Sequence, residues 1–221
     1  TFVKWNLMTL AVSLGVSQLA TAGVVSDQSE AKGFVEDSSL TVHLKNYYFN
    51  RDGKNGGGDR KDWTQGVLGN FSSGFTQGTV GFGVDAYGYW GIKLDGGAGT
   101  AGTGNLPVDR HGDPEDEYGT AGGAIKMRIS KTELRYGDLM PTAPVFAAGG
   151  SRLFPQTATG FNLLSSDIAG LELDGGHFTG GNGPVTTNHD HDIYASYAGV
   201  TASSIDYAGG KYTFNDNLTA S

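Results

Sequence analysis

The feature that most constrains this chain is a period-two alternation of apolar and polar residues, which demands extended strands. From Val80 to Trp90 every second residue is apolar or glycine, whereas the positions between them hold glycine, aspartate or tyrosine. Successive side chains of a strand point to opposite faces, so the segment has one apolar face and one small or polar face. The pattern recurs in 40–49 and 124–130, and all three segments are predicted to be strands. Their polar faces fit either a water-filled lumen or the solvent side of a soluble sheet.

The first residues contain the three parts of a secretory signal peptide in the right order. Lys4 supplies positive charge, Leu7 to Val16 form an apolar core, and Ala20-Thr21-Ala22 is a small-residue cleavage site. We therefore predict a signal peptide at 1–22 and an exported protein at 23–221. After Ala22 no apolar run approaches the ~20 residues of a spanning helix, so insertion into a membrane requires a β-barrel.

Composition argues against several classes of protein. Only 38% of residues are hydrophobic and 37 are glycine, which suits a barrel in which every second strand residue is apolar. The absence of cysteine excludes disulfides and thiolate metal sites. A net charge of −8 argues against a nucleic-acid partner. His177 with Asp174 or Asp192 suggests a hydrolase only weakly, because no Gly-x-Ser-x-Gly elbow exists. We predict a protein that is not an enzyme and needs no cofactor.

The connections between the predicted strands fall into two sizes, which largely alternate along the chain. Short connections lie at 72–76, 130–132 and 215–217, and long ones at 51–62, 96–120, 140–166 and 179–192. Outer-membrane barrels have short periplasmic turns and long external loops, so this order favours a barrel. The loops at 51–59 and 188–192 contain possible metal ligands, but their spacing favours ordinary polar loops. We predict no metal site.

The long segment at about 140–166 differs from the other loops because it is apolar and holds three of the six prolines. A solvated loop is normally polar, so this one has to pack against other residues. It either folds into the barrel or lies over the rim. Folding inward places Arg152, with Ser151 beside it, in the lumen on a stiff support, where the cation attracts an anionic group.

Basic residues also alternate within the predicted strand at 124–130, and Arg135 follows it. Lys126, Arg128 and Arg135 either solvate a lumen wall or form part of a series of cations that guides a solute. Several cations along a low-dielectric wall focus the electric field toward the solute. The first interpretation is the simpler one. Asp85 is a candidate to oppose an amino group.

Several long phrases resemble the OprD family of substrate-selective porins. Tyr136–Phe146 and Gly150–Phe161 are similar to the third external loop of that family. The other matching phrases are Gly33–Leu40, Asn46–Gly53, Gly74–Gly78 and Gly176–Thr179. The resemblance runs from about Ser26 to Ser221.

The resemblance implies an all-β fold, a transmembrane antiparallel β-barrel in the outer membrane of a Gram-negative cell. The family pattern is a monomeric barrel of about eighteen strands, a number within the range of outer-membrane barrels. Residues 23–221 are then its N-terminal part, and 140–166 is an inward-folded constriction loop. Arg152 matches a basic position in that loop, and Tyr197 matches a lumen-side tyrosine near the narrowest point. The ends of the sequence suggest a fragment of a longer gene.

The function implied by the resemblance is facilitated diffusion of small carboxylate-bearing solutes into the periplasm. Basic amino acids, small peptides and carbapenem antibiotics belong to this class, and the expected partners are these solutes and outer-membrane lipid. Two alternatives stay open. One is a general porin that selects by size alone, and the other is a secreted β-rich adhesin or passenger domain.

Overall fold

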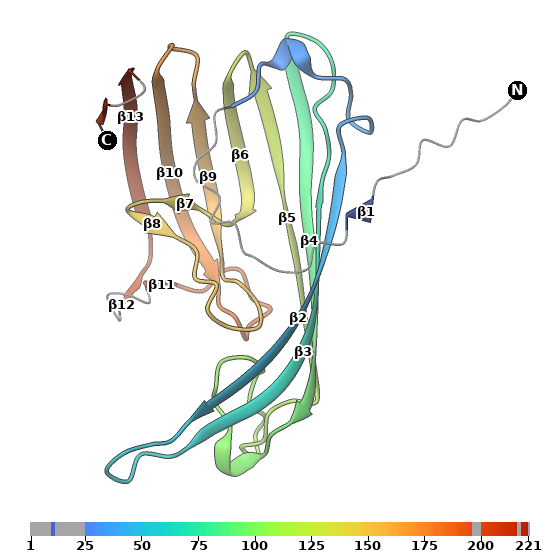
Figure 1. Ribbon diagram of the computed structural model, residues 1–221, viewed down its shortest axis with the longest axis vertical. Helices are drawn as coiled ribbons and strands as arrows, with labels where there is room; N and C mark the ends of the chain where they lie inside the picture. The colour runs from blue at the N-terminus through green and yellow to red at the C-terminus, as the bar shows by residue number, and fades with distance from the viewer. Residues whose placement is uncertain (1–9, 12–24, 196–199, 216–217, 221) are drawn as a thin grey trace, which may run out of the picture.

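The computed structural model describes residues 10–11, 25–195, 200–215 and 218–220, and these are almost entirely β (Figure 1). Two three-residue 3-10 helices, η1 (Gln28–Glu30) and η2 (Ala98–Thr100), interrupt the strands. No helix in the described ranges is long and apolar enough to cross a membrane. The strands are β1 (Leu10–Ala11), β2 (Ser39–Arg51), β3 (Arg60–Ser72), β4 (Val80–Asp95), β5 (Glu117–Ile129), β6 (Thr132–Leu139), β7 (Thr142–Ala143), β8 (Phe146–Ala147), β9 (Thr157–Ser165), β10 (Leu171–Asn182), β11 (Ile193–Ala195), β12 (Val200–Ala202), β13 (Ile205–Asn215) and β14 (Leu218–Ala220).

One large sheet contains ten of these strands in the order β1-β2-β3-β4-β5-β6-β9-β10-β13-β14. From β2 to β14 every neighbouring pair is antiparallel, whereas β1 lies parallel to β2. The sheet curves around a concave side, as Figure 1 shows. Among the described residues no pairing joins β2 to β13 or β14, so the sheet is an open part of a barrel. The predicted signal peptide lies outside the described residues, apart from Leu10 and Ala11.

The three strands predicted from alternation are confirmed, and each is longer than predicted. The register assigns alternate residues to two faces. Asp85 and Tyr87 of β4 belong to the inner face, which lines the concave side, whereas Phe82 belongs to the outer face. Phe82 is 55% exposed and Ile125 of β5 is 62% exposed, and these two residues lie close together because Phe82 pairs with Met127 and Val84 with Ile125. Large exposed apolar side chains on one face of a curved sheet indicate a surface that contacts lipid.

The connections separate by size between the two ends of the sheet. Short turns at 73–79, 130–131 and 166–170 form one end, called the turn end, and the long loops form the other, called the loop end. The strands extend further than predicted, because β3 begins at Arg60 and pairs with β2 up to Arg51. Likewise β9 begins at Thr157, so the apolar loop predicted at 140–166 ends at Gln156 and its second part is strand.

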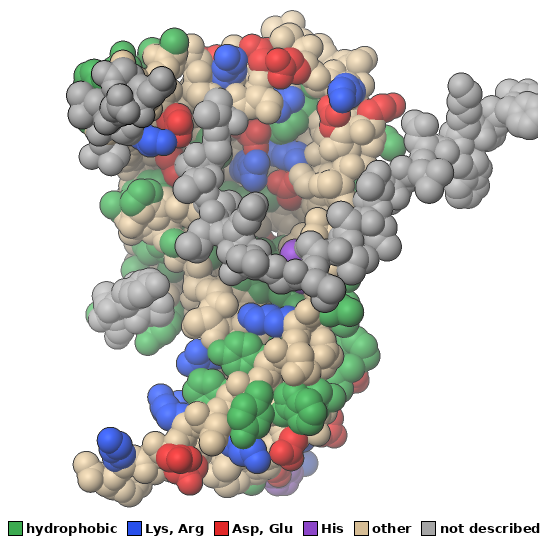
Figure 2. All heavy atoms as spheres, viewed as in Figure 1, with side chains coloured by type: hydrophobic (Ala, Val, Ile, Leu, Met, Phe, Trp, Pro, Cys, Tyr) green, Lys and Arg blue, Asp and Glu red, His purple; other side chains and the backbone are tan. Residues whose placement is uncertain are grey.

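The buried apolar side chains gather on the inner face rather than between layers. One cluster contains Leu68, Tyr87 and Tyr89 of β3 and β4, together with Leu106, Leu153 and Phe154 from two of the long loops. A second cluster joins Phe178 of β10 to Ala124, Leu139, Ala158 and Ile193. Figure 2 shows acidic and basic side chains together in the upper part of the concave side, toward the turn end. The inner face therefore has its apolar clusters toward the loops and a group of acidic and basic side chains toward the turns.

Candidate functional site

The loop at 140–156 lies against the inner face of the sheet and is held there by two aromatic or aliphatic side chains. Leu153 is 0% exposed and Phe154 is 1% exposed, and the Phe154 ring lies 5.6 Å from that of Tyr89. Gly91 makes room for them, because a Cβ at that position would lie 2.7 Å from Leu153 Cδ2. Burying each of the two side chains contributes about 1.5–3 kcal/mol. This geometry supports an inward-folded loop.

Main-chain carbonyls of the loop tip, Ser151–Phe154, accept hydrogen bonds from β2. The Tyr47 hydroxyl donates to the Ser151 carbonyl at 2.9 Å, and the Lys45 ammonium donates to the Arg152 carbonyl. Tyr47 and Lys45 are two residues apart, so their side chains point to the same, inner face. Lys45 therefore holds the backbone of the tip.

The Arg152 guanidinium is fixed through two of its three nitrogens. Its Nε donates to the Thr103 carbonyl at 2.8 Å, and Nη1 donates to the Ser151 carbonyl at 3.0 Å. The guanidinium carbon lies 5.2 Å from the centroid of the Phe49 ring, within the range of a cation–π contact. Within the part of the chain that the structure describes, Nη2 has no hydrogen-bond partner. Because guanidinium N–H groups form strong hydrogen bonds with carboxylates, Nη2 is available to bind one.

At the turn end, the structure brings the predicted wall residues Lys126 and Asp85 together. Lys126 Nζ lies 2.7 Å from Asp85 Oδ1 and also donates to Ser72 Oγ at 2.7 Å. Arg135 lies 3.8 Å from the other oxygen of Asp85 and also pairs with Glu133. The side chain of Lys126 is only 4% exposed. Asp85, the candidate to oppose an amino group, thus already faces two cations of the chain itself.

Arg128, the third predicted wall residue, is buried by the segment that precedes β2. Its Nε donates to Gln28 Oε1 at 3.1 Å, and its guanidinium carbon lies 4.1 Å from the Phe75 ring centroid. The Gln28 backbone N–H donates to the Ser130 carbonyl at 2.8 Å. Arg128 therefore contacts other parts of the chain, not open lumen.

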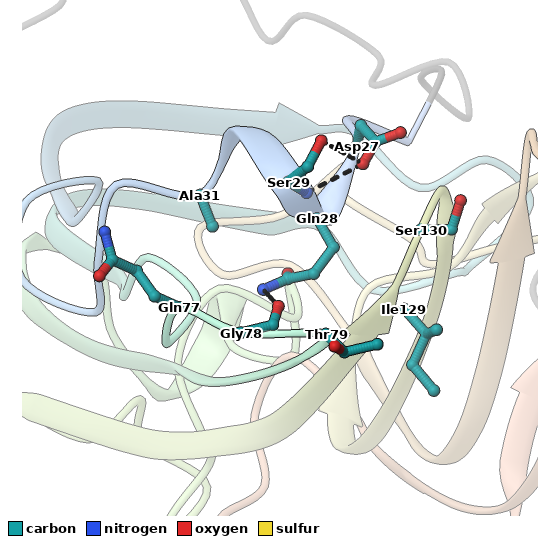
Figure 3. A pocket seen from close by; sticks show the side chains of 9 residues that line it. All are labelled: Asp27, Gln28, Ser29, Ala31, Gln77, Gly78, Thr79, Ile129 and Ser130. Carbon is teal, nitrogen blue, oxygen red and sulfur yellow. Dashed lines mark hydrogen bonds between the residues drawn. The ribbon is translucent and has the colours of Figure 1, made fainter.

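The segment around η1 covers the turn end and forms an open pocket there (Figure 3). In that view the Gln28 side chain reaches from η1 toward Gly78, whose carbonyl accepts a bond from its Nε2 at 3.1 Å. Hydrogen bonds from the backbone and the hydroxyl of Ser29 lower the pKa of Asp27 at the start of η1. The pocket is a product of this contact between the segment and the turns.

Asp174 of β10 is a further acidic residue on the inner face. It was not predicted from the sequence as a partner for an amino group. Its Oδ1 accepts bonds from Asn162 Nδ2 at 2.8 Å and from the Tyr207 hydroxyl at 3.1 Å. No Lys or Arg of the described residues forms an ion pair with it. A regular alternation count along β10 would have placed it on the same face as Gly176 and Phe178.

His177 lies on the opposite face of β10 and does not pair with Asp174. Its Nδ1 lies 2.6 Å from Asp206 Oδ1 of β13, on the exposed outer face. The described ranges contain no group of three or more His, Asp or Glu side chains that could hold a metal ion. Tyr197, the other predicted constriction residue, lies outside the described residues.

Comparison with known proteins agrees with this geometry. Residues 32–221 match the model of the outer membrane porin, OprD family. The chain is 63% identical over 220 residues to Porin D of Pseudomonas aeruginosa, covering 99% of this chain and 50% of that protein. The chain belongs to the OprD family of outer membrane porins, which are channels rather than enzymes. This confirms the predicted family and outer-membrane location.

Solved structures of the family share the fold. The structure of Pseudomonas aeruginosa OprD is 56% identical with a TM-score of 0.67, covering 88% of this chain and 42% of that chain. That of Pseudomonas aeruginosa OpdK with vanillate is 38% identical with a TM-score of 0.74, covering 83% of this chain and 47% of that chain. The predicted all-β transmembrane barrel class is confirmed. The chain spans about half the length of the curated relatives it matches.

Proposed function

We propose that this chain contributes to an outer-membrane channel for the facilitated diffusion of small carboxylate-bearing solutes into the periplasm. The observation that carries the proposal is the Arg152 guanidinium, fixed through Nε and Nη1 on an inward-packed loop with Nη2 unpartnered among the described residues. Its fixed position lowers the entropy lost when a carboxylate binds. A single site of this kind binds weakly enough for the solute to leave again.

The remaining parts of the proposal concern the constriction, the oligomeric state and export. The loop at 140–156 is the constriction, with Ser151 and Tyr197 beside the passage, and the channel is monomeric. Residues 1–22 direct export. The OpdK structure contains vanillate, which is a carboxylate, and this supports a carboxylate-bearing solute for a relative with the same fold.

Basic amino acids, small peptides and carbapenem-type antibiotics are the solutes we propose within this class. A basic amino acid also needs a partner for its ammonium group. Asp85 is paired with Lys126 and Arg135, whereas Asp174 is held only by neutral donors. We therefore assign the ammonium group to Asp174 rather than to Asp85.

The proposal is tested by replacing Arg152 with Ala in the whole protein that carries this chain. Hydrogen bonds to charged groups contribute about 1.5–3 kcal/mol, so we expect at least about a tenfold loss of carboxylate uptake at low solute concentration. Uptake is measured in proteoliposomes with a carboxylate and a neutral solute of equal size.

Arg51→Ala is the matched control, because it removes an exposed arginine at the loop end that no ion pair engages among the described residues. The control should leave carboxylate uptake unchanged. If Arg152→Ala affects the carboxylate and the neutral solute equally, or affects neither, the channel selects by size alone and the carboxylate proposal is wrong.

A further inference from the structure

Asp62 on the inner face of β3 is a fully buried carboxylate that the proposed transport function does not use. It is 1% exposed, and among the described residues it forms no ion pair with Lys, Arg or His. Its charge is met by neutral donors from the loop between β4 and β5. The Asn105 side-chain Nδ2 donates to Oδ1 at 2.8 Å, and the Thr103 hydroxyl donates to Oδ2. A buried charge is costly, so these bonds strongly favour one arrangement of the loop.

The carboxylate also fixes the direction of the next hydrogen bonds. An ionised carboxylate only accepts, so the Asn105 amide has to turn its nitrogen toward Asp62. Its Oδ1 is then left to accept the backbone N–H of Leu153 at 3.0 Å. The opposite amide orientation would place two donors against each other at Leu153. Asn105 is 0% exposed, so water cannot relieve that conflict.

Thr103 makes the second connection to the loop tip. Its hydroxyl donates to Asp62 and accepts the Asn105 backbone N–H at 3.2 Å, while its carbonyl accepts Arg152 Nε at 2.8 Å. Asp62 is thus joined to the backbone of Leu153 through Asn105 and to the guanidinium of Arg152 through Thr103. Residues from three separate parts of the sequence meet at this point.

We propose that Asp62 is a positioning residue that sets the place and orientation of Arg152 through Thr103 and Asn105. The effect of this positioning on transport rests on the proposed carboxylate channel, whereas the positioning of Arg152 by Asp62 does not. Leu153 and Phe154 keep the loop against the wall by burial, and the polar connections decide where the guanidinium points. Loss of the connections therefore displaces Arg152 without releasing the loop.

The test exchanges the polarity of the pair in the whole protein that carries this chain. Asp62→Asn keeps one acceptor oxygen for two donors, so either Asn105 Nδ2 or the Thr103 hydroxyl loses its acceptor, and Asn105→Asp places two carboxylates side by side. The double variant Asp62→Asn/Asn105→Asp restores the match, because the new amide donates to the new carboxylate, whose second oxygen accepts the Leu153 N–H. We expect each single variant to reduce carboxylate uptake at low concentration about tenfold and the double variant to recover most of it.

A second readout follows the loop tip directly. The chain contains no cysteine, so Ser151→Cys, at an exposed position, introduces one thiol into this chain. Its rate of reaction with a water-soluble maleimide should change several-fold in either single variant and return in the double variant. Asp95→Asn is the control, because Asp95 is exposed and pairs only with Lys61 among the described residues. If Asp62→Asn does not assemble, Thr103→Val removes the hydroxyl that donates to Asp62 and accepts the Asn105 backbone N–H, and it should change both readouts in the same direction.

The outcomes separate this inference from the proposed function. Labelling that changes in the single variants and returns in the double variant supports positioning, even if Arg152→Ala has no effect on uptake and the carboxylate proposal fails. In the Arg152→Ala background, Asp62→Asn should cause no further loss of carboxylate uptake. Unchanged labelling in the single variants, or a double variant no better than either single one, would overturn the positioning role.

Discussion

Both ends of the inner face contain cations, but the cations differ in how deeply they are buried and in what holds them. At the turn end Lys126 and Arg128 are buried, and each is bound to a partner within the chain. At the loop end Arg152 is held through Nε and Nη1, and its Nη2 has no partner among the described residues. A cation on a pore wall is therefore not by itself a solute site. What distinguishes Arg152 is that its unpartnered Nη2 belongs to a partly exposed side chain, whereas Lys126 and Arg128 are buried.

The strongest way to break this comparison is to release the loop that carries Arg152. Leu153→Ala removes a side chain that is 0% exposed, and such changes cost about 2–5 kcal/mol. We expect the loop to leave the wall, so that single-channel conductance rises and carboxylate preference disappears together. Val145→Ala in the same loop, at a residue 77% exposed, is the control and should change neither. Unchanged conductance in Leu153→Ala would show that the loop does not narrow the passage.

A second substitution tests the opposite end. Lys126→Met deprives Asp85 of its nearer cation and leaves Arg135 at 3.8 Å. We expect a loss of about 1–3 kcal/mol in the free energy of unfolding, measured with urea in detergent micelles, and unchanged carboxylate uptake. Lys61→Met, which breaks an exposed pair with Asp95, should cost no more than about 1 kcal/mol. Carboxylate uptake that falls as far as in Arg152→Ala would assign Lys126 to the solute path.

The smallest expected effect concerns the turn between β9 and β10. Hydrogen bonds from Ser130, from Thr132 and from the Lys131 backbone N–H lower the pKa of Asp167. The ionised form therefore stabilises the folded state above the pKa of the unfolded chain, and this contribution is lost as pH falls through the lower folded pKa. Asp167→Asn should make acid unfolding less steep. Identical acid-unfolding curves for the two proteins would show that the turn does not depend on this charge.

The sequence predicts three strands and the first part of the apolar loop, because these depend on local pattern, whereas the second part of that loop is β9. Alternation from Val80 to Trp90 identifies β4 without any knowledge of its neighbours. It does not reveal that Asp85 meets Lys126, since this requires the β4–β5 register and a position 41 residues away. The role of Asp62 is harder still, because Thr103 and Asn105 lie in an irregular loop whose path no periodicity describes. The sequence also places Asp62 in a loop, because the predicted connection runs to residue 62. Its position on the inner face of a strand is therefore not predicted.

The hydrogen bonds from β2 to the main chain of the loop tip have a consequence for how such channels diversify. Tyr47 and Lys45 hold the carbonyl oxygens of Ser151 and Arg152, which every amino acid possesses. The tip can therefore exchange its side chains for others while the same two anchors keep its main chain in place. Substitution of one or two side chains at the tip can therefore change which solutes a channel admits, while the strands of the barrel wall stay the same.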